Sequence, residues 1–531
     1  MQQPKPHSVR YPALIADIDA GRIKIPKFQR EFVWSVDATA KLLDSILKGY
    51  PIGTFILWQT RERMSSIRNI GDAQLPETPD GDAVQFVLDG QQRITSIYAA
   101  LKGITVEREG KAHDYKDIFV NLDIDPTNLD ESIVVSEKPL GMHLRLHDLL
   151  NMRASQIVGY TSNATIIDRI DRYKQAFETY DFSAITMSNE SVDDAIEVFT
   201  RINTGGTELT LFEIMCAKTY DESQGFDLRE QYDVLAGRIA EAGYDVPSST
   251  VLQCLGVILD GECKRKTILK LDRDRIISAW EDMSEALKET VEYFRSTYRI
   301  PVSGILPYNA LLVPFTYFFW KKKDVPSPIQ AKYLQEFFWK ASLSYHYSSA
   351  VETKLGQDIK RVDSILQDER PKYDYKPQLN REDLVSQSFS VGDSFCKAIL
   401  CLFAYHQPLS FQNNASVRLD NAWLKVSFSK NYHHFFPKAF LRKQGIVDAN
   451  VILNIAFVDD YLNKRTIKAR APSDYVRQFE QDNPHLREAL KSHLILDPVA
   501  FGIWDDDFVK FLEERAKVVE EELHKRLEPI T

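Results

Sequence analysis

The spacing of apolar and polar positions predicts alternating helices and strands in the first hundred residues. One helix ends at Gly49 and Pro51, and its buried face is Leu42, Leu43, Ile46 and Leu47. The run Ile52 to Trp58 predicts a strand, and Phe86 to Leu88 predicts another. A turn at Asp89-Gly90 follows, and a second helix starts at Gln91 and buries Ile94, Ile97, Tyr98 and Leu101.

The turn between this strand and helix has the features of an anion site. The free N–H groups and the positive end of a helix face the same point. Gln91, Gln92 and Arg93 lie in the first helical turn and offer amide and guanidinium groups to phosphate or ribose. Asp89 either holds a metal ion or fixes the turn. The alternative is an ordinary βα turn with an aspartate N-cap.

The middle of the chain, 221–385, is expected to be mostly helical. Residues 276–298 have the spacing of an amphipathic helix, and the aromatic stretches 315–320 and 337–347 are expected to be core. The apolar stretch 305–320 contains prolines and ends in three lysines, which predicts a buried helix and no membrane span. Residues 368–383 are the best linker candidate.

The stretch 431–463 predicts a strand, a loop, a second strand and a helix. His433 and His434 lie at its start, Asn454 opens the apolar run 455–458, and Asn463 falls on the expected helix. Neighbouring strand residues point to opposite faces, so one imidazole should face a metal ion and the other the water, or one of the two is structural.

These groups suit phosphodiester hydrolysis. A neutral imidazole can take the proton of a water near pH 7. An imidazole and an amide oxygen can hold one divalent ion and leave positions open for phosphate. The alternative is a buried histidine pair in an ordinary β-hairpin.

Composition indicates a globular protein with more than one domain. The 531 residues are too many for one core, and hydrophobic and charged fractions of 44% and 27% are ordinary. The first residues carry no apolar signal core, and the five cysteines have no zinc spacing. We therefore expect a cytoplasmic protein with reduced thiols.

Charge is unevenly distributed along the chain. The whole chain has a net charge of −10, yet residues 425–480 contain ten Lys or Arg against five Asp or Glu, a net of +5. Such a patch favours phosphate binding, and its candidate DNA contacts are Lys438, Lys464, Arg465 and Lys468. A solvated basic helix face is the alternative.

The stretch 431–463 resembles an HNH, or ββα-metal, nuclease motif in the HH-x-x-P form of GmrSD-type modification-dependent restriction enzymes. The resemblance implies that His433 is the strand ligand of the metal and His434 the general base. It implies that Asn454 braces the loop and orients the base, and that Asn463 is the helix ligand. Many HNH sites have Asp first and His last, where this chain has His433 and Asn463.

A second resemblance covers about the first 220 residues. FQREFVW, LDSILKGYPIG, DGQQR and VFTRINTGGTELTLFEI occur in this order, as in the ParB/sulfiredoxin-like N-terminal domain of GmrSD proteins and SspE-type phage-defence proteins. In that family DGQQR is linked to nucleotide binding and hydrolysis. The resemblance therefore implies a nucleotide site formed by Gln29, Arg30, Asp89, Gly90, Gln91, Gln92 and Arg93, with Asn203 as a weaker candidate.

Together these features predict an α+β, multidomain protein. Its expected parts are a ParB-like domain in 1–220, a helical connecting domain in 221–385, and an HNH nuclease domain in 386–531. The latter is expected to be mostly helical around the ββα-metal motif.

The expected function is cleavage of modified phage DNA, with a divalent metal (Mg²⁺, or Mn²⁺) and a nucleoside triphosphate as cofactors. The resemblance points to glucosylated hydroxymethylcytosine or backbone phosphorothioate as the modification. The sequence leaves open whether the protein forms a homodimer. One alternative is a nucleotide-dependent, ParB-like DNA-binding switch with an inactive nuclease domain. Another is a nuclease without nucleotide turnover.

Overall fold

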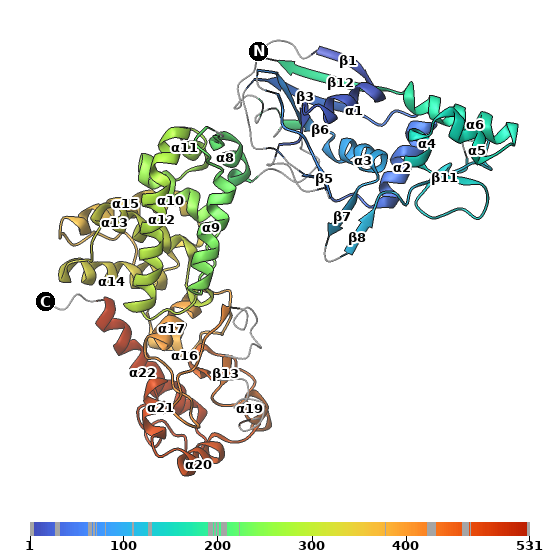
Figure 1. Cartoon of the computed structure of the whole chain (residues 1–531). Coiled ribbons are helices and arrows are strands. Elements are labelled where there is room, and N and C mark those ends of the chain that lie inside the picture. The colour runs from blue at the N-terminus through green and yellow to red at the C-terminus, as the bar shows by residue number, and fades with distance from the viewer. Residues whose placement is uncertain are drawn as a thin grey trace. The chain divides into compact units, whose positions relative to one another are not determined.

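The computed structural model divides the chain into two compact units, Met1–Leu228 and Arg229–Thr531 (Figure 1). The structure describes residues 5–26, 32–61, 66, 69–70, 72–79, 81–108, 111–125, 130–188, 195, 198, 201–202, 210–221, 223–377, 379–421, 432–458, 467 and 469–527. Each unit is described by itself below.

The first unit is built on a mixed five-stranded sheet with the order β1-β12-β3-β6-β2. The strands in that order are Lys5–Arg10, Asp181–Ser188, Thr54–Thr60, Val84–Asp89 and Ile23–Lys24. The pairs β1–β12 and β3–β6 are antiparallel, whereas β12–β3 and β2–β6 are parallel. The strands predicted at 52–58 and 86–88 are therefore β3 and β6, two neighbours inside this sheet.

Helices pack against this sheet through a shared apolar cluster. The helices of the unit are α1 (Tyr11–Asp19), α2 (Val36–Leu47), α3 (Gln91–Lys102), α4 (Leu146–Asn151), α5 (Ala154–Tyr160), α6 (Ala164–Glu178) and α8 (Leu211–Thr219). Alternate β3 residues, Phe55 and Leu57, join side chains from α1, α2, α3 and α6 in this core. The predicted buried face of α2 is confirmed, as is that of α3 except for the half-buried Leu101.

Short strands complete the first unit. They are β4 (Asn69–Ile70) with β5 (Ala73–Gln74), β7 (Thr105–Arg108) with β8 (Lys111–Asp114), and β9 (Phe119–Asn121) between β10 (Val134–Val135) and β11 (His143–Arg145). At the start of α8, Thr210 and Glu213 form the capping box that their spacing predicts.

The second unit begins with a helical bundle. Its helices are α9 (Leu228–Glu241), α10 (Ser248–Asp260), α11 (Arg265–Ile268), α12 (Arg273–Ser296), α13 (Leu312–Lys322), α14 (Pro328–Leu343), α15 (Val351–Leu366), α16 (Arg381–Ser386) and α17 (Ser394–Tyr405). Single 3₁₀ turns lie between them at η1 (Ser303–Ile305), η2 (Asn309–Leu311) and η3 (His346–Ser348). The predicted amphipathic helix is α12, and the aromatic stretches are core, as expected.

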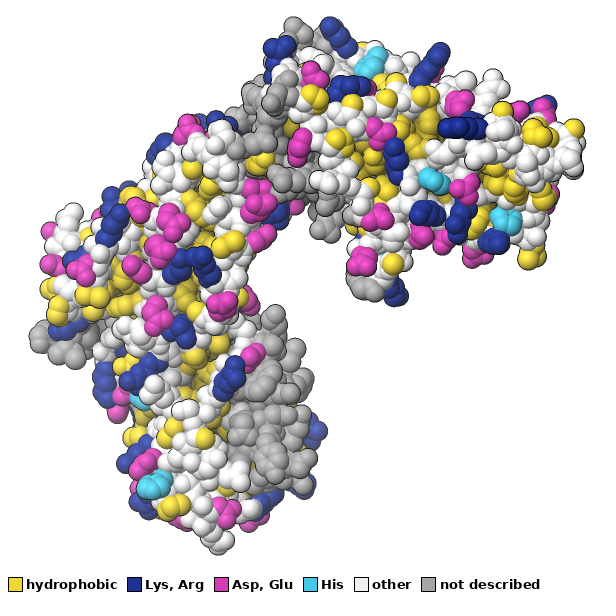
Figure 2. All heavy atoms as spheres, in the orientation of Figure 1, with side chains coloured by type: hydrophobic (Ala, Val, Ile, Leu, Met, Phe, Trp, Pro, Cys, Tyr) yellow, Lys and Arg dark blue, Asp and Glu magenta, His cyan; other side chains and the backbone are white. Residues whose placement is uncertain are grey.

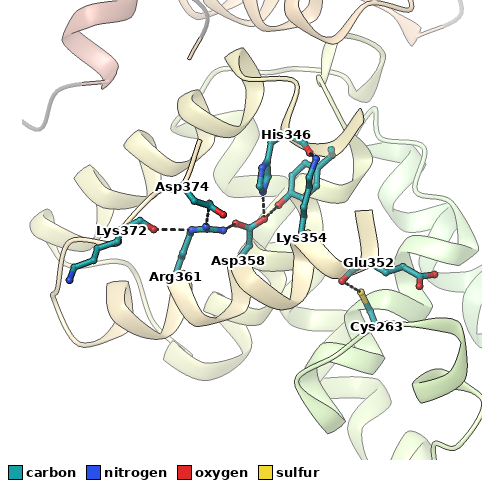
Figure 3. Close-up of polar contacts among 9 residues, drawn as sticks. Cys263, His346, Glu352, Lys354, Asp358, Arg361, Lys372 and Asp374 are labelled. Carbon is teal, nitrogen blue, oxygen red and sulfur yellow. Dashed lines mark hydrogen bonds and ion pairs between the residues drawn. The ribbon is translucent and has the colours of Figure 1, made fainter. Parts of the chain in front are cut away.

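The segment expected to be a linker is instead packed on α14 and α15. Arg361 donates to the Lys372 carbonyl at 3.0 Å and pairs with Asp374, while Arg370 pairs with the buried Glu336 at 2.8 Å. Figure 3 shows that Arg361 also contacts Asp358. Asp358 is fully buried and accepts a hydrogen bond from the His346 ring at 2.9 Å. Composition predicted a linker because it cannot show these long-range pairs.

The rest of the second unit surrounds a two-stranded sheet. Its elements are β13 (Tyr432–His434), α19 (Lys438–Lys443), η4 (Ile452–Asn454), β14 (Ile455–Phe457), α20 (Pro472–Asp482), α21 (Leu486–Ser492) and α22 (Phe508–Leu527). The helix α22 packs against α14, α16 and η4. The two strands predicted for this stretch are present, and the helix expected from Asp459 lies outside the described residues.

The α+β, multidomain fold class is confirmed. In the part of the chain that the structure describes, no helix combines the length and apolarity that a bilayer crossing needs. All five cysteines are buried and unpaired with one another. Figure 2 shows Lys and Arg side chains interspersed with Asp and Glu on the visible face of both units.

Candidate functional sites

His433 and His434 lie on β13, which pairs antiparallel with β14. The register sets His433 opposite Ala456 and His434 opposite Ile455. Because side chains alternate along a strand, the two rings face opposite sides of the ladder. His433 is buried, with 4% of its surface exposed, and His434 is half-buried. The two imidazoles therefore have different surroundings, as expected.

Asn454 joins the two strands to the loop between them. Its side chain is fully buried and accepts from the Phe436 N–H at 2.8 Å. Its amide donates to the carbonyls of Phe436 and Ala449, each at 3.0 Å. The Asn454 carbonyl also accepts from the Phe435 N–H at 2.8 Å. One amide thus satisfies buried backbone groups on both sides of α19 and fixes the loop that follows the histidines.

The ring of His434 is held by a residue that the sequence pattern did not single out. His434 Nε2 lies 3.0 Å from Asn450 Oδ1. Burial lowers the pKa of His434 from 6.5 to about 4, against the hydrogen bond with Asn450, and the nearby positive charge of Lys438 adds to the decrease. The ring is therefore neutral near pH 7, which is the form that a general base requires.

Lys438 is the first residue of α19, directly after Pro437. It is half-buried, and desolvation lowers its pKa. Asn463, Lys464, Arg465 and Lys468 lie outside the described residues, as do Lys425 and Lys430 of the basic stretch. Arg442 and Lys443 are exposed in the last turn of α19. Of the four candidate DNA contacts the structure therefore describes Lys438, and the basic stretch also includes Arg470, just before α20, and Arg477, exposed in α20.

Of the two expected metal ligands, the structure describes only the one on the strand, His433. Within the described ranges, no group of three His, Cys, Asp or Glu side chains is placed to hold a metal ion. His433 is the described member of the expected donor pair, and Asn463, its expected partner, is outside those ranges. The imidazole is a suitable ligand for a divalent transition metal, and the ligand set as a whole remains a prediction.

Behind β14, a buried arginine fixes the backbone on either side of Asn454. Arg515 of α22 is fully buried and donates to the carbonyls of Leu453 at 2.6 Å and Ile455 at 2.8 Å. It also donates to the His493 carbonyl at 2.9 Å, and its guanidinium lies 4.5 Å from the centre of the Phe403 ring. Desolvation lowers its pKa to about 9. Sequence reasoning missed this residue because α22 begins more than fifty residues after Asn454.

In the first unit, the predicted turn between β6 and α3 depends on a glycine. Gly90 is the N-cap of α3 with φ of 92°, in the left-handed region, and no side chain caps the helix. A Cβ at this position would lie 2.5 Å from Phe55 Cδ1. The turn is therefore restricted to glycine both by conformation and by space. Gly90, and not Asp89, occupies the N-cap position.

Arg93 connects α3 to the beginning of β3. Its guanidinium donates to the carbonyls of Ile52 at 2.7 Å and Thr54 at 3.2 Å, and to Asp89 Oδ2 at 3.2 Å. A Cβ on Gly53 would lie 2.2 Å from Arg93 Nη1, so the close approach also requires that glycine. These contacts give Arg93 and Asp89 a role in the fold, and their contact with a nucleotide stays a prediction.

The two glutamines of the turn are buried and connected. Gln91 and Gln92 are 5% and 7% exposed, and Gln92 donates to Gln91 Oε1 at 3.0 Å. Gln92 Oε1 accepts from the Val33 N–H at 2.9 Å. Among the described residues, Gln91 Nε2 has no hydrogen-bond partner although it is buried. A buried amide without a partner is unfavourable, which makes this atom a candidate ligand contact.

Gln92 thereby holds the segment that follows FQRE. Arg108 donates to the Trp34 carbonyl at 3.0 Å, and the Tyr115 hydroxyl donates to the same carbonyl at 2.5 Å. Gln29, Arg30 and Asn203 lie outside the described residues. The structure thus brings the DGQQR turn to the end of the FQREFVW segment, at Val33.

Part of the chain is similar to a known protein family. Residues 13–220 match the family described as the GmrSD restriction endonuclease, N-terminal domain. The matched range contains the β6–α3 turn and every strand of the five-stranded sheet except β1. The match relates the first unit to the N-terminal domain of GmrSD restriction endonucleases.

The chain is also similar to an uncharacterized protein of Methanocaldococcus jannaschii. The two are 23% identical, and the similarity covers 95% of this chain and 96% of that protein. The similarity therefore includes the second unit as well as the first.

Proposed function

We propose that this protein is a defence nuclease of the GmrSD type that cuts or nicks modified foreign DNA. The match of residues 13–220 supports the class, and DNA is the substrate that the class implies. The single observation that supports cleavage by this chain is the half-buried His434 ring on β13, followed by the loop that Asn454 fixes.

In the proposed reaction His434 is the general base. The O–H bond of a water breaks as its proton passes to the ring, and the water oxygen forms a bond to phosphorus. The bond between phosphorus and the leaving oxygen breaks, and its electron pair goes to that oxygen, which takes a proton from solvent. A divalent ion bound by His433 and Asn463 would neutralise charge on the phosphate. Asn454 keeps the loop after the histidines in place.

The test is cleavage of plasmid and phage DNAs with defined modifications, in Mg²⁺ or Mn²⁺, with and without each nucleoside triphosphate. The set includes glucosylated hydroxymethylcytosine, phosphorothioate and unmodified DNA. We expect His434→Ala to lower cleavage at least a hundredfold, in keeping with the usual contribution of a general base of about 10²–10⁴. His524→Ala, on the exposed face of α22, is the matched control.

Equal cleavage by His434→Ala and the wild type would remove the proposed site. Absence of metal-dependent cutting on every DNA would instead favour a nucleotide-dependent DNA-binding switch.

For the first unit we propose nucleoside triphosphate binding, with hydrolysis, at the β6–α3 turn. The observation that supports it is the helix start at Gly90 together with the buried Gln91 amide. Gln91→Ala is expected to weaken triphosphate binding about tenfold, while Gln175→Ala on the exposed side of α6 leaves it unchanged. Isothermal titration measures both. Unchanged affinity in Gln91→Ala would exclude this amide as a ligand contact.

A further inference from the structure

The orientation of the Asn450 side chain is fixed by a segment far away in sequence. Asn450 Nδ2 lies 3.0 Å from the carbonyl oxygen of Phe389. A carbonyl oxygen only accepts hydrogen bonds, so the amide nitrogen faces Phe389 and the amide oxygen faces His434. Phe389 also donates its N–H to the Asn450 carbonyl at 2.8 Å, which holds the two residues together at both backbone and side chain.

Residues 387–389 form a short extended pairing with residues 450–452. Ser388 bridges Val451 in antiparallel fashion, and the Ile452 N–H donates to the Gln387 carbonyl at 2.9 Å. Phe389 is 3% exposed, and its ring meets that of Tyr432 edge to face at 5.0 Å. The segment between α16 and α17 is therefore built into the ββ pair that carries the histidines.

This arrangement selects one tautomer of the His434 ring. Asn450 Oδ1 only accepts, so the His434 Nε2 that it contacts at 3.0 Å must carry the hydrogen. In a neutral imidazole the other nitrogen, Nδ1, then holds the lone pair. Only the nitrogen with the lone pair can accept a proton from water.

We propose that Asn450 is a positioning residue that fixes the His434 ring with Nε2 protonated and Nδ1 as the basic atom. This rests on the proposed nuclease function for its catalytic consequence, but the state of the ring is a property of the folded chain. Asn450 does not touch the reacting atoms. It orients the His434 ring through its amide oxygen, and the Phe389 carbonyl in turn orients the Asn450 amide. Loss of the amide allows the ring to rotate or to exchange tautomers.

The experiment reads the ring directly in the full chain. Histidine labelled with ¹⁵N is incorporated, and the His434 signals are assigned by their loss in His434→Gln. We expect a pyrrole-type Nε2 and a pyridine-type Nδ1 in the wild type. In Asn450→Ala both signals move toward averaged values. In Asn450→Asp the Nε2 signal stays pyrrole-type, because a carboxylate also accepts from Nε2.

A matched control removes a similar set of bonds elsewhere in the unit. Asn483 is buried and makes three side-chain hydrogen bonds, to Phe411, Asn414 and His485. Asn483→Ala should leave the His434 signals unchanged. If Asn450→Ala does not fold, Asn450→Asp and Asn450→Gln still test the proposal, since Gln is one methylene too long to contact both partners.

Cleavage provides the second readout. Asn450→Ala should lower kcat at least about tenfold, because Nδ1 is no longer fixed as the basic atom, with KM for DNA within about twofold. Asn450→Asp should retain more activity than Asn450→Ala.

Each outcome decides one of the two proposals. A wild-type ring with the hydrogen on Nδ1, or signals unchanged in Asn450→Ala, would overturn the positioning role. If no DNA is cut but Asn450→Ala changes the ring signals as expected, the positioning role stands and the nuclease function fails.

Discussion

His493 provides a quantitative test of how the second unit is stabilised. Its ring is buried beside Arg515 and Phe411, and Nε2 donates to the Leu409 carbonyl at 3.0 Å. Burial lowers its pKa from 6.5 to about 3, although the bond to Leu409 acts in the opposite direction. The replacement His493→Gln keeps a side-chain N–H for Leu409 and removes the titrating group.

The sign follows from proton binding. Below pH 6.5 the unfolded chain binds a proton at this histidine, while the folded chain excludes it until the pH approaches 3. The contribution of His493 to stability is therefore complete above pH 6.5 and decreases as the pH falls. Between pH 7 and pH 5 the loss is about 2 kcal/mol in the free energy of unfolding. The Gln variant should lack this loss.

The rate at which peroxide oxidises a buried methionine, followed at increasing urea concentrations, gives the urea midpoint for unfolding of the unit that contains that methionine. Met283 is fully buried in α12 of the second unit, and Met215 is fully buried in α8 of the first. The urea midpoint for Met283 should fall less between pH 7 and pH 5 in His493→Gln than in the wild type, and that for Met215 should respond equally in both. Equal decreases at Met283 would refute the assigned burial of a neutral His493. His524→Ala is the control for loss of an exposed histidine.

Three further changes test the contacts around the two sites. Gly90→Ala should destabilise the first unit by at least about 2 kcal/mol, because the left-handed φ and the clash with Phe55 both oppose a Cβ; the Met215 urea midpoint measures it, and a neutral effect would contradict the described turn. Asn454→Ala should cost on the order of 3–5 kcal/mol, because it leaves buried backbone groups without partners; a midpoint for Met283 within error of the wild type would show that the loop is held otherwise. Arg515→Lys should cost about 2 kcal/mol by the same measurement, since one ammonium cannot reach three carbonyls at once; an unchanged midpoint would mean that the guanidinium fork contributes no stability.

The sequence pattern predicted those elements that are determined by residues close together along the chain. The buried face of α2 follows from helical spacing, and the β6–Gly90–α3 turn follows from a glycine between a strand and a helix. The capping box of Thr210 with Glu213 needs only three residues of separation. In each case the residues that interact are neighbours along the chain, so their spacing is sufficient.

Contacts between distant segments were beyond such patterns. Asn450 owes its orientation to Phe389, which lies 61 positions earlier, and Arg515 contacts carbonyls 60 and 62 positions before it. Arg93 has the composition of a phosphate ligand, yet its donors are used by the carbonyls of Ile52 and Thr54. A motif names residue types, but only the fold decides which partners they meet.

The last helix has a mechanical consequence for the second unit. With 20 residues, α22 is about 30 Å long. Arg515, two turns into the helix, donates to the backbone on either side of Asn454. Farther along, Glu520 pairs with Arg381 at 2.8 Å, and Arg526 lies over the ring of Trp339 in α14. The helix α22 therefore connects the helical bundle to the backbone around η4 and β14. A fragment that begins at residue 386 would lose two of these three contacts, because Arg381 and Trp339 precede that residue.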